Sequence, residues 1–362
     1  LFKLSFNDYC LKYKIYKFNE DFKYKKNLEG RVKYLLDVKG FISIKNIFHL
    51  CRLRSMRFLI KDPTLNLKKE NIDLIISSSP ISLKQQNNKS SNLIQIIHDA
   101  LPLQIPSHPE NGWIFYNRLN DSHKHSNCMY VSQESKNIVT NFLNMKNPNI
   151  KPNEIIYPMP SLEIELLEKA FKIPFIGPIN KKFILFNSSI VPRKKVENAI
   201  NYFLKSNLPK RNFLFCIAGK IHKNNYCYQI KDLCKNHKEI LLLDYVSETE
   251  KAWLFLNTSL LISTSSCEGF GIPILDALSL NLCSLASEIP SYKEIKNLSK
   301  KNKISLVNQT NQSQWIENLN SLSEFDIKNN YEKRKRINHF SMFKNDLEKN
   351  YLLKIGKYLN KN

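Results

Sequence analysis

Glycine is scarce in this sequence, and the places where it occurs are informative for that reason. Only 8 of the 362 residues are glycine, which is well below the usual share of ~7% and excludes collagen-like, glycine-rich-linker and repeated glycine-fingerprint architectures. No stretch approaches the ~18 to 20 apolar residues of a membrane span, and residues 1–6 lack the apolar core of a signal peptide. We therefore expect a soluble, cytoplasmic chain. Because the first residue is Leu1 rather than Met, we also expect the natural start to lie upstream.

Several motifs that define common enzyme classes are also missing. The sequence has no D-x-D pair, P-loop, H-E-x-x-H, G-x-S-x-G or G-x-G-x-x-G. This argues against metal-dependent transfer, ATP hydrolysis at a Walker site, serine hydrolysis and standard NAD chemistry. The 8 cysteines form no C-x-x-C pair, a pattern typical of reduced thiols in a cytosolic protein. We predict no metal site.

Positive charge is in surplus. Lys+Arg number 55 against 32 Asp+Glu, a net charge of +23. Basic clusters at 12–26 and 333–336 could hold anionic lipid, nucleic acid or a phosphorylated substrate. Because the lysines are scattered along the chain, we favour a solvated surface for most of them and expect no nucleic-acid partner. Peripheral contact with an anionic membrane stays open.

The pattern of apolar runs predicts an α/β protein with two domains. Short strand-like runs occur at 73–77, 92–97 and 128–131, and the second half alternates strands and helices from 183 to 286. Such alternation is typical of a parallel sheet covered by helices, as in a Rossmann-like domain. Prolines between 158 and 178 interrupt the periodicity. We therefore predict an N-terminal domain over 1–175, a second domain over 176–340 and a closing C-terminal helix over 341–362.

Candidate ligand-binding residues follow the predicted strands, where open α/β sheets bind their ligands. After the strand 260–263 comes the run Glu268-Gly269-Phe270-Gly271-Ile272-Pro273, with Asp276 in the helix that it opens. Two scarce glycines let backbone N–H groups approach a ligand, and the two carboxylates can face one cleft. The alternative is a capped helix with a solvated Glu. We favour the site.

Three weaker candidates lie after other strands. Arg193 and Lys194 precede a helix, where cations oppose the helix dipole unless an anion is bound as well. They are also compatible with an ordinary run of charges. Gly219 and Lys220 could approach a nucleotide or simply form a turn. His98 could hydrogen-bond a sugar hydroxyl, and a structural histidine is equally compatible with the sequence.

Taken together, these segments resemble a known family. The runs 266–278 and 287–294 look like the donor-site signature of glycosyltransferase family 4, the retaining "glycosyl transferases group 1", and 191–195, 217–220 and 244–248 fall in that family's order and approximate spacing. The resemblance covers roughly residues 70 to 355. It implies a GT-B fold, with two Rossmann-like domains facing across a cleft and a C-terminal helix crossing back to the N-terminal domain.

The resemblance also implies a function. Such enzymes transfer a hexose, with mannose as our guess, from a GDP- or UDP-linked sugar to a glycan or lipid-linked acceptor in surface polysaccharide synthesis. They need no metal and no cofactor other than the donor. We expect this activity in the cytoplasm, at or near the inner face of the membrane. A non-catalytic GT-B relative that acts as a scaffold or partner subunit is the alternative.

Residue roles carry over position by position. The resemblance implies that Glu268 contacts donor-sugar hydroxyls and that His98 touches the sugar near the reacting centre, and we take these two as the catalytic residues. Donor binding is implied for the following residues: Arg193, Lys194, Gly219, Lys220, Gly269, Phe270, Gly271, Ile272 and Asp276. Among these, Lys194 would bind the diphosphate and Asp276 the ribose.

The sequence departs from the family in three places. Asp276 stands where the family usually has Glu, and Ser188 stands where many members have Gly or a phosphate-binding Arg. The family's first strand and glycine-rich loop are missing from the start of the chain. These departures put the ribose contact, the support for Lys194 and the activity of this exact chain in doubt.

Overall fold

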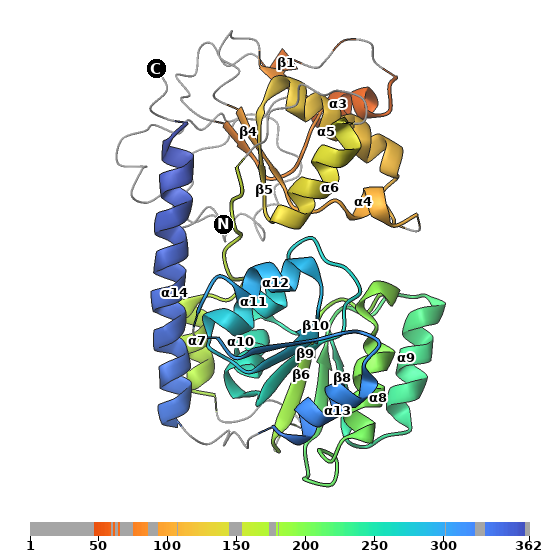
Figure 1. Cartoon of the computed structure of the whole chain (residues 1–362), viewed down its shortest axis with the longest axis vertical. Helices are drawn as coiled ribbons and strands as arrows, with labels where there is room; N and C mark the ends of the chain where they lie inside the picture. The colour runs from red at the N-terminus through yellow and green to blue at the C-terminus, as the bar shows by residue number, and fades with distance from the viewer. Residues whose placement is uncertain are drawn as a thin grey trace, which may run out of the picture. The chain divides into compact units, whose positions relative to one another are not determined.

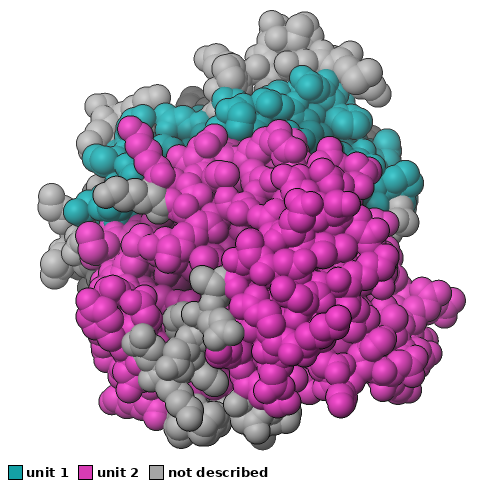
Figure 2. Space-filling view, turned by 60° about the horizontal axis from the view of Figure 1, so that its bottom comes forward, with its two compact units in different colours: residues 1–159, 346–362 teal, residues 160–345 magenta. Residues whose placement is uncertain are grey.

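A computed structural model gives the fold of the chain (Figure 1). It describes residues 47–58, 61, 64–65, 75–85, 93–106, 108–144, 154–173, 179, 181–300, 302–322 and 330–358. The chain divides into two compact units, which Figure 2 colours separately: unit 1 comprises Leu1–Met159 and Asp346–Asn362, and unit 2 comprises Pro160–Asn345. The predicted loss of the first strand concerns residues outside the described part.

Unit 2 is built on a six-stranded parallel sheet. Its strands, in spatial order, are β11 (Ile304–Val307), β10 (Ser284–Ser287), β9 (Leu260–Ser263), β6 (Phe183–Asn187), β7 (Leu214–Ala218) and β8 (Ile240–Asp244). This order is that of a doubly wound Rossmann sheet, in which the chain runs outward from a central strand first to one side and then to the other. The alternation of the sequence predicts all of these strands except β11.

Helices cover both faces of this sheet (Figure 1). One face packs against α8 (Val196–Lys205), α9 (Asn225–Lys235) and α13 (Gln312–Asn320), and the apolar stripe predicted for α8 is buried there. The other face carries α10 (Glu248–Asn257) and α11 (Ile272–Ser279), with Phe183 of β6 stacked on Trp253 of α10. Large buried aromatic side chains therefore fill both layers of the core.

Unit 1 contains a smaller parallel sheet, in the order β2 (Ile75–Ser77), β4 (Leu93–Ile97) and β5 (Asn127–Tyr130). β4 is central and wholly buried, as its run of apolar residues predicts. A second sheet pairs β1 (Thr64–Leu65) with β3 (Lys84–Gln85). The helices are α3 (Ile47–Ser55), α4 (Leu101–Gln104), α5 (Gly112–His125) and α6 (Gln133–Asn144).

The boundary between the units differs from the predicted one. The sequence places it after residue 175, whereas α7 (Ile164–Phe171) groups with unit 2. Trp253 of α10 explains this, because its indole nitrogen donates a hydrogen bond of 2.9 Å to the carbonyl of Ile173 just after α7. Of the prolines that interrupt the periodicity, Pro158 and Pro160 flank the observed boundary, which falls between Met159 and Pro160.

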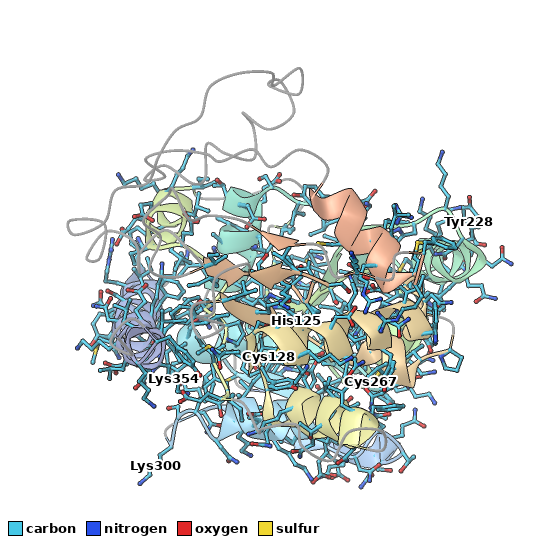
Figure 3. The ribbon with its side chains drawn as sticks, turned by 90° about the horizontal axis from the view of Figure 1, so that it is seen from above. His125, Cys128, Tyr228, Cys267, Lys300 and Lys354 are labelled. Atoms are coloured by element: carbon cyan, nitrogen blue, oxygen red, sulfur yellow. The ribbon has the colours of Figure 1, made fainter. Side chains whose placement is uncertain are left out.

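The C-terminal helix α14 (Asn330–Gly356) begins earlier than the predicted 341. Its first part belongs to unit 2, where Arg336 donates to the carbonyls of Phe255, Leu256 and Thr258 at the end of α10. Its last part belongs to unit 1, where Lys354, labelled in Figure 3, donates to the carbonyl of Ile155 at 2.6 Å. Within the described part of the chain, no helix is long and apolar enough to cross a membrane.

Candidate active site

The switch point of the unit 2 sheet lies between β6 and β9. The chain leaves β6 for β7 on one side and later returns to β9 on the other, so the loops after these two neighbouring strands part from each other. Ligands of open α/β sheets bind in the crevice that results. Arg193 and Lys194 follow β6 in the short 3₁₀ turn η2 (Pro192–Lys194), and Glu268 follows β9. The sheet thus brings the predicted cations and the predicted carboxylate together.

Glu268 forms ion pairs with both cations. One of its oxygens, Oε2, lies 2.7 Å from Nη1 of Arg193, and Oε1 accepts a hydrogen bond from Nζ of Lys194. The side chains of Lys194 and Glu268 are only 7% and 6% exposed, whereas that of Arg193 is 28% exposed. Burial lowers the pKa of Lys194, and its ion pair with Glu268 opposes that shift. With Arg193 beside it, this largely dry place offers positive charge to an anionic ligand.

Hydrogen bonds to main-chain carbonyls join the two loops. The hydroxyl of Thr264, just after β9, donates to the carbonyls of Lys194 and Lys195 at 2.9 and 2.7 Å. The N–H of Ser266 donates to the carbonyl of Arg193 at 2.8 Å. Lys195 turns the chain into α8 with a left-handed φ of 50°. The charged side chains therefore project from a rigid framework, which lowers the cost of holding a ligand.

The environment of Glu268 favours its ionised form. Burial alone would raise the pKa of this carboxyl, but Lys194, Arg193 and the hydroxyl of Ser265 at 2.7 Å outweigh burial and lower it. Glu268 is therefore a carboxylate at neutral pH. In that form it is a pure hydrogen-bond acceptor, as a contact to sugar hydroxyls requires.

The Gly269-Phe270-Gly271 turn leads directly into α11, whose first residue is Ile272. Phe270 is buried, and Gly271 adopts a left-handed φ of 111°. α11 has no side-chain cap, its second residue Pro273 carries no N–H, and the N–H of Ile274 donates to the carbonyl of Gly271 at 3.0 Å. The predicted support of a donor sugar by the amides around Gly269 to Gly271 stays a prediction.

Asp276 is completely buried in α11. Its oxygens accept hydrogen bonds from the N–H of Ser161 at 2.6 Å and from the hydroxyl of Ser161 at 2.5 Å. Ser161 lies at the start of unit 2 and is distant from Asp276 in the sequence. The structure therefore shows an intramolecular partner for the carboxylate that the resemblance assigns to the ribose, and the ribose contact stays a prediction.

Burial raises the pKa of Asp276 to about 6, despite the hydrogen bonds from Ser161. Between about pH 4 and pH 6 the folded protein therefore retains a proton that the unfolded chain has lost, so stability falls as the pH rises through this window. We expect the wild type to lose up to about 3 kcal/mol relative to the Asp276→Asn variant between those pH values. Urea unfolding of both proteins at several pH values measures this, and parallel pH profiles would contradict it.

Gly219 and Lys220 follow β7. A Cβ at Gly219 would lie 1.7 Å from the carbonyl oxygen of Ser188, so the close approach found here is between two loops of the chain. Lys220 is exposed. In unit 1, His98 follows β4 directly and is also exposed, while the carboxylate of Asp99 accepts a hydrogen bond of 3.2 Å from the N–H of Leu101. The nucleotide role of Gly219 and Lys220 and the sugar contact of His98 stay predictions.

Three polar residues of this region are absent from the candidates derived from the sequence. Ser265 and Tyr292 donate hydrogen bonds to Glu268, and Ser161 holds Asp276. Tyr292 lies inside the second run that resembles the family, 287–294, which is the signal that could have singled it out. For Ser161, no pattern in the sequence points to its partner.

Comparison with known proteins agrees with this geometry. Residues 170–340 match the family model described as "Glycosyl transferases group 1". The matched segment is slightly less than half of the chain. The match contains both loops of the ion cluster and supports glycosyl transfer as the chemistry of the domain. Among curated proteins, none matches the sequence at a significant level.

Several solved structures share the fold of this chain. HepE from Anabaena, solved with UDP and glucose, is 14% identical with a TM-score of 0.56, covering 77% of this chain and 78% of that one. Sucrose-phosphate synthase from Thermosynechococcus elongatus is 11% identical (TM-score 0.57; 88% and 79% covered). WaaG, a glycosyltransferase involved in lipopolysaccharide biosynthesis, is 12% identical (TM-score 0.55; 82% and 80% covered). The predicted GT-B class of two Rossmann-like domains is confirmed.

Proposed function

We propose that this protein is a glycosyltransferase that moves a hexose from a nucleotide diphosphate sugar to a glycan or lipid-linked acceptor, with retention at the sugar carbon and without a bound metal. The observation that carries the proposal is the buried cluster of Arg193, Lys194 and Glu268 at the switch point of the unit 2 sheet. It offers positive charge for a diphosphate and a carboxylate for sugar hydroxyls within one small site.

Each residue of the cluster has a distinct part in the proposed reaction. Lys194 acts as a point charge on the diphosphate, and the planar guanidinium of Arg193 can bind two of its oxygens. As the bond from the sugar carbon to the phosphate oxygen breaks, negative charge grows on the leaving diphosphate, and these cations stabilise it. The acceptor oxygen bonds to the same face of that carbon and passes its proton to the leaving phosphate oxygen.

For the donor we propose GDP-mannose, with a UDP-linked hexose as the other choice. HepE, solved with UDP and glucose, supports the second choice by its fold. For the acceptor we propose a component of surface polysaccharide, assembled in the cytoplasm at the inner face of the membrane. The involvement of WaaG in lipopolysaccharide biosynthesis is in line with this proposal.

Titration calorimetry with GDP-mannose and UDP-glucose tests donor binding. The Lys194→Gln variant keeps a hydrogen-bond donor for Glu268 but removes the charge, so we expect it to bind the donor at least about tenfold more weakly. The Lys210→Ala variant, which removes an exposed charge from the same unit, should bind as the wild type does. Equal donor affinity in the wild type and the Lys194→Gln variant would remove Lys194 from the site.

A non-catalytic GT-B relative acting as a scaffold or partner subunit is the second candidate. One observation favours it: Asp276 accepts hydrogen bonds from the N–H and the hydroxyl of Ser161, within the protein itself. The same calorimetry separates the two candidates. A folded wild-type protein that binds neither nucleotide sugar would favour the scaffold.

A further inference from the structure

Tyr292 lies beneath the ion cluster and is almost completely buried. It comes from α12 (Pro290–Lys296), the helix that follows β10. Its hydroxyl lies 2.7 Å from the hydroxyl of Ser263, at the end of β9, and donates to Oε1 of Glu268 at 3.3 Å. A buried tyrosine hydroxyl needs a hydrogen-bond partner, and this one links a strand end to the proposed catalytic carboxylate.

The ring of Tyr292 also packs closely against Gly271, the last residue of the Gly269-Phe270-Gly271 turn. A Cβ added to Gly271 would lie 2.4 Å from Cε1 of Tyr292, and the φ of 111° at Gly271 disfavours any larger residue as well. The glycine that ends the turn is therefore required by its packing against this ring. Tyr292 thus contacts the loop at both ends, through its hydroxyl at Glu268 and through its ring at Gly271. Cys267, labelled in Figure 3, marks the start of the same loop.

Hydrogen bonds to Glu268 are distributed unevenly between its two oxygens. Oε1 accepts from Lys194, from Ser265 and from Tyr292. Among the described residues, the donor to Oε2 is Arg193. A carboxylate has about four acceptor positions, two on each oxygen. The protein therefore saturates Oε1 and leaves capacity on Oε2.

We propose that Tyr292 is a positioning residue of the donor site: it holds Glu268 through Oε1, so that Oε2 is the atom presented to a hydroxyl of the donor sugar. This inference rests on the proposed function. Because Tyr292 is buried under Glu268, it acts through the carboxylate and does not contact the donor. Held in this way, the carboxylate is preorganised for its contact and need not reorient when the donor binds.

The Tyr292→Phe variant tests the hydroxyl while keeping the ring against Gly271. We expect kcat/KM for the donor to fall about tenfold, the usual consequence of losing a hydrogen bond to a charged group. The Ser265→Ala variant, which removes another donor to Oε1, should act in the same direction. The Tyr130→Phe variant is the matched control, because it removes another buried tyrosine hydroxyl, which lies 2.6 Å from Nε2 of His123 in unit 1.

A pH profile separates positioning from a merely structural role. The charged and titratable groups facing Glu268 are Arg193 and Lys194 from η2 and Tyr292 from α12, with Cys267 next to it in the loop. The Tyr292→Phe variant removes a hydrogen bond to the ionised form of Glu268. The pKa of the Glu268 carboxyl should therefore rise, and the acid limb of the activity profile should move to higher pH. Stability loss alone would leave that limb in place.

Carbon-13 titration of the glutamate carboxyls, with Glu268→Gln to assign the signal, keeps this inference separate from the proposed function. If the wild type neither binds nor turns over a nucleotide sugar, the proposed function fails, while the titration still reports whether Tyr292 contacts the carboxylate. An upward shift of the Glu268 titration in Tyr292→Phe supports the contact. If the wild type is active and Tyr292→Phe matches it in kcat/KM and in pH profile, the positioning role is overturned.

Discussion

Replacing Glu268 with alanine is expected to lower kcat/KM for sugar transfer at least about a hundredfold while nucleotide diphosphate binding is retained or strengthened. The variant loses the acceptor for sugar hydroxyls. It also leaves Arg193 and Lys194 without the carboxylate that they share in the present structure. Arg193 then meets the diphosphate without a competing carboxylate. Loss of Glu268 also lowers the pKa of the buried Lys194 further, and a bound diphosphate replaces the lost negative partner. Sugar transfer should therefore fall while diphosphate binding does not.

Steady-state transfer assays and calorimetry with the free nucleotide diphosphate measure the two effects. Glu317→Ala, on the outer surface of α13, is the control for loss of an exposed carboxylate and should leave both measurements unchanged. Glu268→Gln keeps the size of the side chain and removes its charge, so we expect an intermediate loss of activity. Turnover at the wild-type rate in Glu268→Ala would remove the proposed site.

Gly219→Ala is expected to destabilise unit 2 by about 3 kcal/mol or more. The new Cβ would lie 1.7 Å from the carbonyl oxygen of Ser188, which is main chain and has little freedom to move. The N–H of Ser188 donates to the carbonyl of Ala218 at 3.0 Å, and the N–H of Gly219 donates to the carbonyl of Asp244 at 2.9 Å. Relief of the clash would break this connection between the ends of β6, β7 and β8.

Urea or thermal unfolding monitored by circular dichroism measures the loss of stability. The neighbouring Lys220→Ala variant is the control, because its exposed side chain should contribute no more than about 0.5 kcal/mol. A Gly219→Ala protein as stable as the wild type would mean that the loop after β6 can move away at little cost.

Gly219 also shows how far glycine scarcity can guide interpretation. In so glycine-poor a chain, the residue predicts a position where something approaches the backbone closely. The structure shows such an approach, by the carbonyl of Ser188. Sequence alone cannot distinguish a ligand from another part of the chain, because the close approach of either one to the backbone requires a residue without a Cβ.

Local patterns predict the elements of unit 2 well, and non-local contacts explain what they miss. The sequence predicts buried strands such as β7, and the apolar stripe of α8, because each of them packs along its whole length into the core of unit 2. Helix α14 begins earlier than expected because its first part belongs to unit 2 and its last part to unit 1, so no single apolar stripe runs along it.

The site could be predicted as a set of residues but not as a network. The loop positions of Arg193, Lys194 and Glu268 follow from strand ends, and the sheet order brings them into contact. Hydrogen-bond partners that are remote in the sequence, such as Ser161 and Asp276, cannot be predicted from it. Tyr292 was hidden for a different reason: a buried tyrosine reads as ordinary core until its hydroxyl is seen to meet a carboxylate.

The division of α14 between the units has a consequence for synthesis on the ribosome. Unit 1 consists of Leu1–Met159 together with Asp346–Asn362, and unit 2 is the uninterrupted segment between them. All of unit 2 is translated before the stretch that carries Lys354, whose ammonium group bonds to the carbonyl of Ile155. The part of unit 1 that is made first is therefore completed only by a segment of α14 that is translated after all of unit 2.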